Sequence, residues 1–168
     1  GQENAVAMQI TETVIKVNDE IKRRMIQKLL DLCDGSFKDK IIAVLGVTFK
    51  PNTDDMRDAP SLTIVPALIG GGAQVRLCDP QGRHEGEHLL PGGRWVEDPY
   101  QASQNADLLV ILTEWNEFRA LDLKIIARKM NQPKMADLRN IYSAKDARKA
   151  GFESYDSIGR EPFSKEPS

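Results

Sequence analysis

The chain has 168 residues, 40% of them apolar and 29% charged, which suits one globular domain of ordinary size. Its formal net charge of −2 argues against the basic surface of a general nucleic-acid binder, and no apolar run of about eighteen residues predicts a membrane span. No secretory signal is visible and the two cysteines suggest no disulfide framework, so we expect a cytoplasmic protein with reduced thiols.

Residues 1–32 carry apolar side chains at intervals of three and four. This spacing predicts one long amphipathic helix that ends near Leu32. Such a helix is longer than one side of a domain this size requires, so its free part should pack on something else. The apolar stripe consists of Val6, Ile10, Val14, Val17, Ile21, Met25 and Leu29.

Residues 41–47 form a continuous apolar run rich in β-branched side chains, the pattern of a strand covered by helices on both faces. The loop at residues 48–59 exceeds the usual two to six residues of a strand-to-helix connection, and such long loops are often functional. Pro60 then stands where a first helical turn tolerates proline. The loop carries two separated cations, Lys50 and Arg57, which suggests a site for a phosphate-bearing ligand.

Short apolar runs and helical stretches alternate along the rest of the chain. This alternation predicts a Rossmann-like, doubly wound α/β fold with a mostly parallel six-stranded sheet, preceded by one long N-terminal helix. The tail at residues 161–168 has too little apolar content to order itself. Further strands are expected at residues 74–78, 94–96, 108–112, 134–136 and 152–154, and helices around residues 60–69, 99–104, 117–130 and 143–150.

Ligands of such sheets bind beyond the carboxyl ends of the strands, where the strand order reverses between the first and fourth strands. Residues 48–57, 113–115 and 137–140 should meet there. Lys50 and Arg139 would then converge, and an ammonium beside a planar guanidinium suits a diphosphate or a nucleotide base. The alternative is that Arg139 pairs with Asp137 or Glu114 and that Lys50 is simply exposed.

Four ordered segments carry a family resemblance: TFKPNTDDMRDAPS at residues 48–61, VRLCDPQG at 75–82, ADLLVILTEWNEFRALD at 106–122 and MADLRNIY at 135–142. They resemble the C-terminal domain of UDP-glucose 6-dehydrogenases, in the UDP-glucose/GDP-mannose dehydrogenase family, over roughly residues 5–160. The resemblance implies a domain that holds the UDP part of the substrate UDP-glucose, while a separate N-terminal domain holds the cofactor NAD.

The resemblance also implies roles for individual residues. Phe49 and Lys50 match the substrate-contacting pair of the family, and Arg139 matches an arginine used against substrate near the subunit boundary. Arg57 matches an arginine that reaches across to NAD when the domains close. The implied organisation is the end of the central dimerisation helix region of a homodimer at residues 1–34, a UDP-binding domain at 35–160 and a disordered tail at 161–168.

The catalytic parts of the family have no counterpart in this sequence. Family members oxidise the sugar C6 alcohol twice with two NAD, through a thioester on a glycine-flanked cysteine. Neither Cys33 nor Cys78 has the sequence setting of an activated thiolate, and no glycine fingerprint for NAD is present. No catalytic residue is therefore assigned, and we expect this chain alone to be inactive.

Three further features are assigned no function. HEGEH at residues 84–88 fits a zinc pattern, but the surrounding glycines and prolines argue against the stable helix that a zinc site needs, so no metal is expected. Asp79 is expected to form an Asp-Pro turn rather than to bind a ribose. Trp115 is expected to be a core-edge residue with a hydrogen-bonded indole rather than a platform for a base.

Two other functions stay open at this point. One is the same domain of a sister dehydrogenase acting on UDP-N-acetylmannosamine or GDP-mannose, although TFKPNTDD and TEWNEF favour the UDP-glucose branch. The other is a stand-alone nucleotide-binding module without catalysis.

Overall fold

A computed structural model of the chain describes residues 19–159 and 162–164. Within it the N-terminal helix covers residues 19–32, and the first half of the predicted apolar stripe lies outside the described residues. No helix in these described ranges is long and apolar enough to cross a membrane.

The centre of the molecule is a seven-stranded sheet in the order β3-β2-β1-β4-β5-β6-β7. Every neighbouring pair is parallel except β6 and β7, which run antiparallel. The strand order reverses between β1 and β4, as the sequence predicts for a doubly wound fold. The strands are β1 (Ile41–Leu45), β2 (Gln74–Cys78), β3 (Arg94–Trp95), β4 (Leu108–Ile111), β5 (Lys134–Asp137), β6 (Ser154–Ser157) and β7 (Phe163–Ser164).

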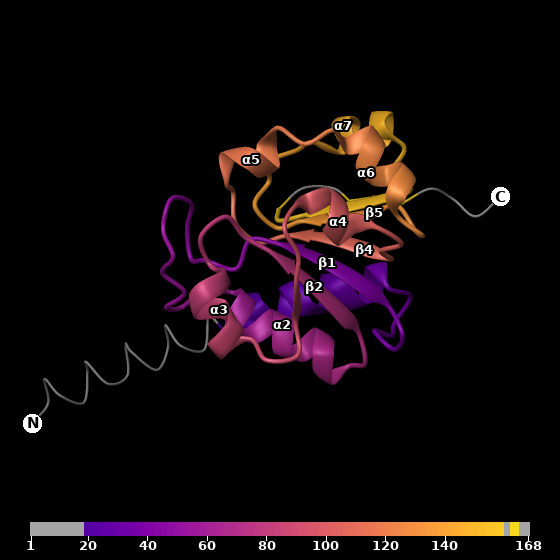
Figure 1. Cartoon of the computed structure of the whole chain (residues 1–168). Helices are drawn as coiled ribbons and strands as arrows, with labels where there is room; N and C mark the ends of the chain where they lie inside the picture. The colour runs from indigo at the N-terminus through magenta and orange to yellow at the C-terminus, as the bar shows by residue number, and fades with distance from the viewer. Residues whose placement is uncertain (1–18, 160–161, 165–168) are drawn as a thin grey trace, which may run out of the picture.

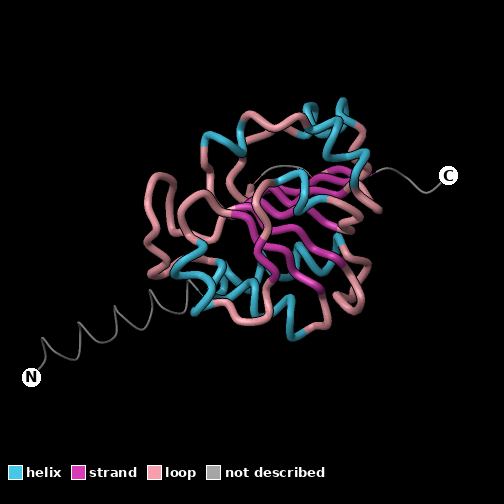
Figure 2. The backbone as a smooth tube through the Cα atoms, in the orientation of Figure 1, coloured by secondary structure: helices cyan, strands magenta, loops and turns pink. Residues whose placement is uncertain are grey.

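Helices cover both faces of this sheet (Figures 1 and 2). The N-terminal helix and α2 pack on one face with α3 at its edge, and α4 to α7 lie on the other. Alternation along β1 supplies both cores, because Ile42 and Val44 point to the first face while Ala43 and Leu45 point to the second. The helices are α2 (Ser61–Gly70), α3 (Arg83–Leu89), α4 (Pro99–Ser103), α5 (Asn116–Arg119), α6 (Leu123–Lys129) and α7 (Ala144–Ala150).

The sheet has one strand more than the six that the sequence predicts. β7 lies inside the expected tail and pairs with β6, where the Phe163 ring stacks on Tyr155 with ring centroids 6.4 Å apart. The Arg148 guanidinium lies 4.5 Å from the centroid of the same ring. One aromatic side chain with two partners thus orders residues that are otherwise polar, which corrects the expectation for Phe163–Ser164.

Two helical segments also differ from the sequence-based expectation. The helix expected around residues 117–130 is divided into α5 and α6, because the Asp122 side chain caps the start of α6 by accepting from Ile125 N. The HEGEH segment does form a helix, α3. Gly86 serves packing there, since a Cβ at this position would lie 2.4 Å from the Trp95 ring.

Candidate functional site

The loop after β1 is fastened to the end of β4 at the point where the strand order reverses. Gly46 has a φ of +93°, and a Cβ there would lie 2.5 Å from Thr113, so only glycine allows the two strand ends to approach this closely. The Thr113 hydroxyl donates to Thr48 O at 2.8 Å, and Trp115 Nε1 donates to Thr48 Oγ1 at 3.3 Å. Trp115 is buried, so its predicted role as a hydrogen-bonded core-edge residue is confirmed.

Asp79 fixes the same loop from the end of β2. Its Oδ2 accepts from Val47 N at 2.8 Å, and its Oδ1 accepts from Gln81 N and Gly82 N at 2.9 and 2.7 Å. The predicted turn role of Asp79 is confirmed, and the structure adds that the same carboxylate positions the first residues of the long loop. The first residues of the loop are therefore hydrogen-bonded to the ends of β2 and β4, the two strands that neighbour β1.

Arg139 follows β5 and reaches back toward this loop. Its Nε donates to Leu112 O at 2.7 Å and its Nη2 donates to Phe49 O at 3.1 Å, which leaves Nη1 without a hydrogen bond to any described residue. Arg139 Nε also lies 3.2 Å from Glu114 Oε2. The ion pair between Arg139 and Glu114, which the alternative interpretation predicted, is therefore present. Together with the carbonyl groups of Leu112 and Phe49, it orients the guanidinium.

A buried carboxylate organises the turn that carries Arg139. Asp137 is fully buried, and its Oδ1 accepts from Arg139 N and Ile141 N at 3.3 and 3.2 Å. Its Oδ2 accepts from Tyr142 N at 2.8 Å and from the Tyr155 hydroxyl at 3.0 Å. Four donors satisfy this carboxylate, so the turn after β5 is a rigid support for the arginine.

A cavity of about 510 Å³ opens beside Arg139 and Phe49. Its walls come from the N-terminal helix, the loop after β1, the start of α2 and the turn after β5. Phe49 is 45% exposed and Ile21 is 44% exposed, so the cavity presents apolar surface next to the guanidinium. The lining residues are Ile21, Lys22, Met25, Phe49, Asp58, Pro60 and Arg139.

The structure brings together only part of the predicted site. Phe49 and Arg139 line one cavity, whereas the exposed Lys50 follows Phe49 in the chain but is absent from the lining. Lys50 Nζ makes no ion pair with a described residue, which leaves it available to a ligand at the rim. The predicted meeting of the loop after β1 with the turn after β5 is thus observed, although their roles in binding stay predictions.

Arg57 belongs to a different surface. Its guanidinium is held by Asp55 through two hydrogen bonds of 3.0 Å each, and these bonds lower the pKa of the Asp55 carboxyl from 3.8 to about 2. Arg57 lines a separate hollow with Glu85 and Leu89 of α3, away from Arg139. The two arginines of the predicted site therefore face different spaces on either side of the loop.

Sequence reasoning did not assign several residues that line this cavity or hold Arg139 beside it. Glu114 was considered only as a competing partner of Arg139, whereas it orients that side chain. Ile21 and Met25 belong to the apolar stripe of the N-terminal helix, and the excess length of that helix was the available signal that they face something else. The rings of His84 and His88 are perpendicular, with centroids 6.1 Å apart. Within the described ranges no group of three His, Cys, Asp or Glu residues is placed to hold a metal ion.

Comparisons with known proteins agree with this geometry. Residues 43–144 match the UDP-glucose/GDP-mannose dehydrogenase family, UDP binding domain. The UDP-glucose 6-dehydrogenase of Rhizobium meliloti is 46% identical over 160 residues, which cover 95% of this chain and 36% of that protein. The UDP-glucose 6-dehydrogenase TuaD of Bacillus subtilis is 39% identical over 154 residues, covering 90% and 32%. The chain thus spans about a third of the length of these relatives.

Solved structures show the same fold. A UDP-glucose dehydrogenase from the archaeon Pyrobaculum islandicum superposes with a TM-score of 0.69 at 29% identity, over 89% of this chain and 32% of that one. A UDP-D-ManNAc dehydrogenase from Pyrococcus horikoshii gives a TM-score of 0.66 at 27% identity, over 84% and 30%.

Proposed function

The chain belongs to the UDP-glucose/GDP-mannose dehydrogenase family, and we propose that it is the UDP-sugar-binding domain of an NAD-dependent UDP-glucose 6-dehydrogenase. The full enzyme would convert UDP-glucose to UDP-glucuronate by oxidising an alcohol to an acid in two steps. The observation that carries this proposal is the cavity where the strand order reverses, with Arg139 fixed beside Phe49.

The cavity offers groups that suit a nucleoside diphosphate. Arg139 is oriented by Leu112 O and Glu114, so its free Nη1 can approach an anion without losing the contacts that hold it. Lys50 at the rim would add a second, mobile positive charge. Phe49 supplies an exposed ring against which a base or sugar can pack. In this proposal Phe49, Lys50 and Arg139 bind substrate.

We assign the oxidation steps to parts of the enzyme that lie outside this chain. NAD would supply the hydride acceptor, and Arg57 is the residue of this chain that we assign to contact with it, since the side chain is 89% exposed. Cys33 and Cys78 are the only cysteines of the sequence, and both are buried with raised pKa values. Neither is an activated thiolate, so we propose that this chain positions substrate and does not turn it over alone.

Assembly and location complete the proposal. We assign residues 1–34 to the dimerisation region of a homodimer, in keeping with the exposed apolar Ile21 on the N-terminal helix. Both described cysteines are unpaired thiols, which agrees with a reducing, cytoplasmic setting. A sister substrate is the second candidate, because the relatives of similar structure include a UDP-D-ManNAc dehydrogenase.

Calorimetric titration of the chain with UDP, GDP and NAD tests this function. We expect UDP to bind, and Lys50→Ala and Arg139→Lys each to weaken it by about tenfold, the loss expected for one charge-assisted hydrogen bond. Arg139→Lys keeps the charge but removes the fork, so it separates recognition geometry from net charge.

Matched variants control this titration. Lys124→Ala removes an exposed lysine of α6, and Arg57→Gln removes the arginine that faces the other hollow, so both should leave UDP affinity unchanged. Tighter binding of GDP would move the assignment to a GDP-sugar enzyme. Binding of NAD alone, or equal losses in Lys124→Ala and Lys50→Ala, would contradict the proposal.

A further inference from the structure

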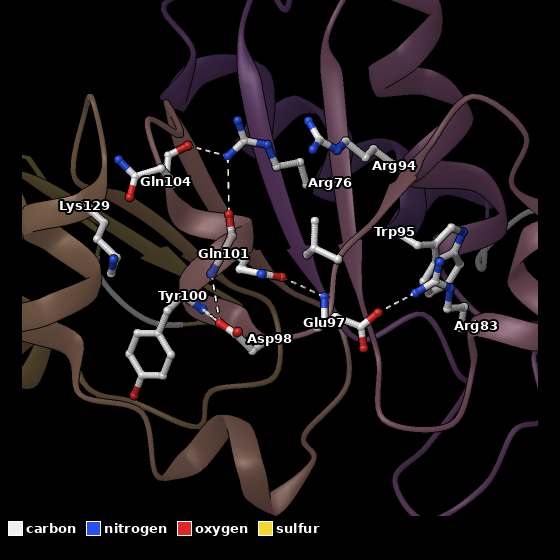
Figure 3. A pocket seen from close by; sticks show the side chains of 11 residues that line it. Arg76, Arg83, Arg94, Trp95, Glu97, Asp98, Tyr100, Gln101, Gln104 and Lys129 are labelled. Atoms are coloured by element: carbon white, nitrogen blue, oxygen red, sulfur yellow. Dashed lines mark hydrogen bonds and ion pairs between the residues drawn. The ribbon is translucent and has the colours of Figure 1, made fainter.

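A second hollow, of about 590 Å³, opens at the β3 edge of the sheet beside α4 and the end of α6 (Figure 3). Four cations that the proposed function does not use line it. Arg83 of α3 is paired with Glu97, and the other three are Arg76 of β2, Arg94 of β3 and Lys129 of α6. We call this space the cationic hollow. It is distinct from the substrate cavity, with which it shares no lining residue.

The register of the sheet forces two of these charges together. Arg76 and Arg94 are paired directly across β2 and β3, and their guanidinium groups lie at the same level in Figure 3. Like charges at directly opposed positions repel one another. The effect reaches the pKa of Arg76, which is lowered first by burial and then by the charge of Arg94.

No described carboxylate neutralises these three cations. Arg76 Nη1 donates to Ala102 O at 3.2 Å and to Gln104 O, which are neutral carbonyl groups at the end of α4. Arg94 and Lys129 form no ion pair with any residue of the described ranges. Elsewhere on the surface, Arg24 and Arg57 each hold a carboxylate, whereas Arg119 and Arg128 form no ion pair with a described residue.

The two carboxylates of the hollow are already engaged. Glu97 Oε1 lies 3.0 Å from Arg83 Nη1, and Asp98 Oδ1 caps α4 by accepting from Tyr100 N and Gln101 N at 2.8 and 2.9 Å. Both lie away from the paired guanidinium groups (Figure 3). Neither carboxylate forms an ion pair with Arg76, Arg94 or Lys129, and the cations that line the hollow outnumber its carboxylates by four to two.

We propose that the cationic hollow is an anion-binding site for the phosphate or pyrophosphate group of a small molecule. The guanidinium fork matches the oxygen atoms of a phosphate, and an ammonium adds a point charge that is free to rotate. A bound dianion would relieve the repulsion between Arg76 and Arg94. The volume falls within the range of about 300 to 1,000 Å³ that small-molecule pockets occupy.

Titration of ¹⁵N-labelled protein with inorganic pyrophosphate and with inorganic phosphate, followed by NMR at low salt, tests the proposal. We expect the backbone signals of residues 94, 101 and 104 and the Arg76 and Arg94 side-chain signals to shift together along one saturable curve. Arg94→Gln should weaken pyrophosphate binding at least about fivefold, since one charge-assisted contact is lost. Arg76 is kept intact because it also closes α4.

Matched substitutions exclude a general effect of net charge. Arg119→Gln removes an exposed arginine of α5, and Arg128→Gln removes the exposed neighbour of Lys129, so each should leave binding unchanged while Lys129→Gln weakens it. The proposal is overturned if the signals of the hollow do not move at millimolar pyrophosphate. It is equally overturned if Arg119→Gln weakens binding as much as Arg94→Gln does.

A third arm separates this site from the proposed substrate site. Titration of the Lys50→Ala variant with pyrophosphate should reproduce the shifts of the cationic hollow, and Arg94→Gln should leave unchanged the part of the UDP affinity that Arg139→Lys removes. Loss of the hollow signals in Lys50→Ala would show a single shared site and would refute the second one. Failure of UDP to bind would count against the proposed function alone.

Discussion

At the scale of single residues, the two cysteines show how burial sets chemistry. Cys33 and Cys78 lie in the cores on opposite faces of the sheet. Burial raises the pKa of Cys33 from 9.0 to about 11 and that of Cys78 to about 12. Above about pH 9 the unfolded thiols lose their protons while the folded ones keep them, so the unfolded state binds fewer protons. The free energy of unfolding should therefore fall as pH rises from about 9 to about 11.

Urea unfolding across this pH range measures the slope. One thiol contributes at most about 1.4 kcal/mol per pH unit, and Cys78→Ala should remove its share of the slope. Because other groups also titrate at high pH, the quantity to compare is the difference between the two proteins. Parallel stability curves for the wild type and Cys78→Ala would show that Cys78 ionises normally when folded.

Asp55 should make the free energy of unfolding fall at low pH, whereas the two cysteines make it fall at high pH. Its carboxyl pKa is lowered to about 2, chiefly by the hydrogen bonds from Arg57. The stabilising contribution of this pair is present above the ordinary pKa of 3.8 and is lost as pH falls toward about 2. In a ¹³C NMR titration, we expect Asp55 to titrate near pH 2 and Arg57→Gln to return the midpoint toward 3.8. A normal midpoint in the wild type would mean that the loop does not hold this pair in solution.

At the scale of elements, α7 is defined by a reciprocal cap. Ser143 Oγ accepts from Asp146 N at 3.0 Å, and Asp146 Oδ2 accepts from Ser143 N at 3.3 Å. We expect Ser143→Ala to lower the free energy of unfolding by about 1 kcal/mol. The backbone N–H of Asp146 loses its acceptor, and the reciprocal bond from Ser143 N is no longer held in place. Chemical denaturation measures this loss. Lys145→Ala, an exposed change in the same helix, should stay within about 0.5 kcal/mol, and a cost equal to that of Ser143→Ala would argue against the cap.

At the scale of the whole molecule, the N-terminal helix is part of the packed core. Leu29 is fully buried in the core cluster, and Lys28 Nζ lies 3.2 Å from Asp156 of β6. Leu29→Ala should therefore lower the free energy of unfolding by about 2 to 5 kcal/mol, as for other buried leucines. Ile21→Ala, at an exposed position of the same helix, is the matched control for denaturant unfolding. If Leu29→Ala and Ile21→Ala lowered the free energy of unfolding by equally small amounts, the helix would be separated from the domain by a boundary near residue 34.

The sequence by itself determined the order of the elements and the reversal of strand order. The continuous apolar runs at residues 41–47 and 108–112 indicate burial on both faces, and buried strands that alternate with helices favour a parallel sheet with helices on either side. The family motif also located the loop after β1. These features are local, because each depends on side chains a few positions apart.

Only the tertiary structure decided which of these side chains share a space. Arg57 and Arg139 both belong to the sequence-predicted site, yet the path of the long loop sends them to different hollows. β7 depends on the contact of Phe163 with Tyr155, and the cationic hollow depends on the register that sets Arg76 against Arg94. Register and loop path arise from contacts between residues distant in the chain, and no local pattern records those contacts.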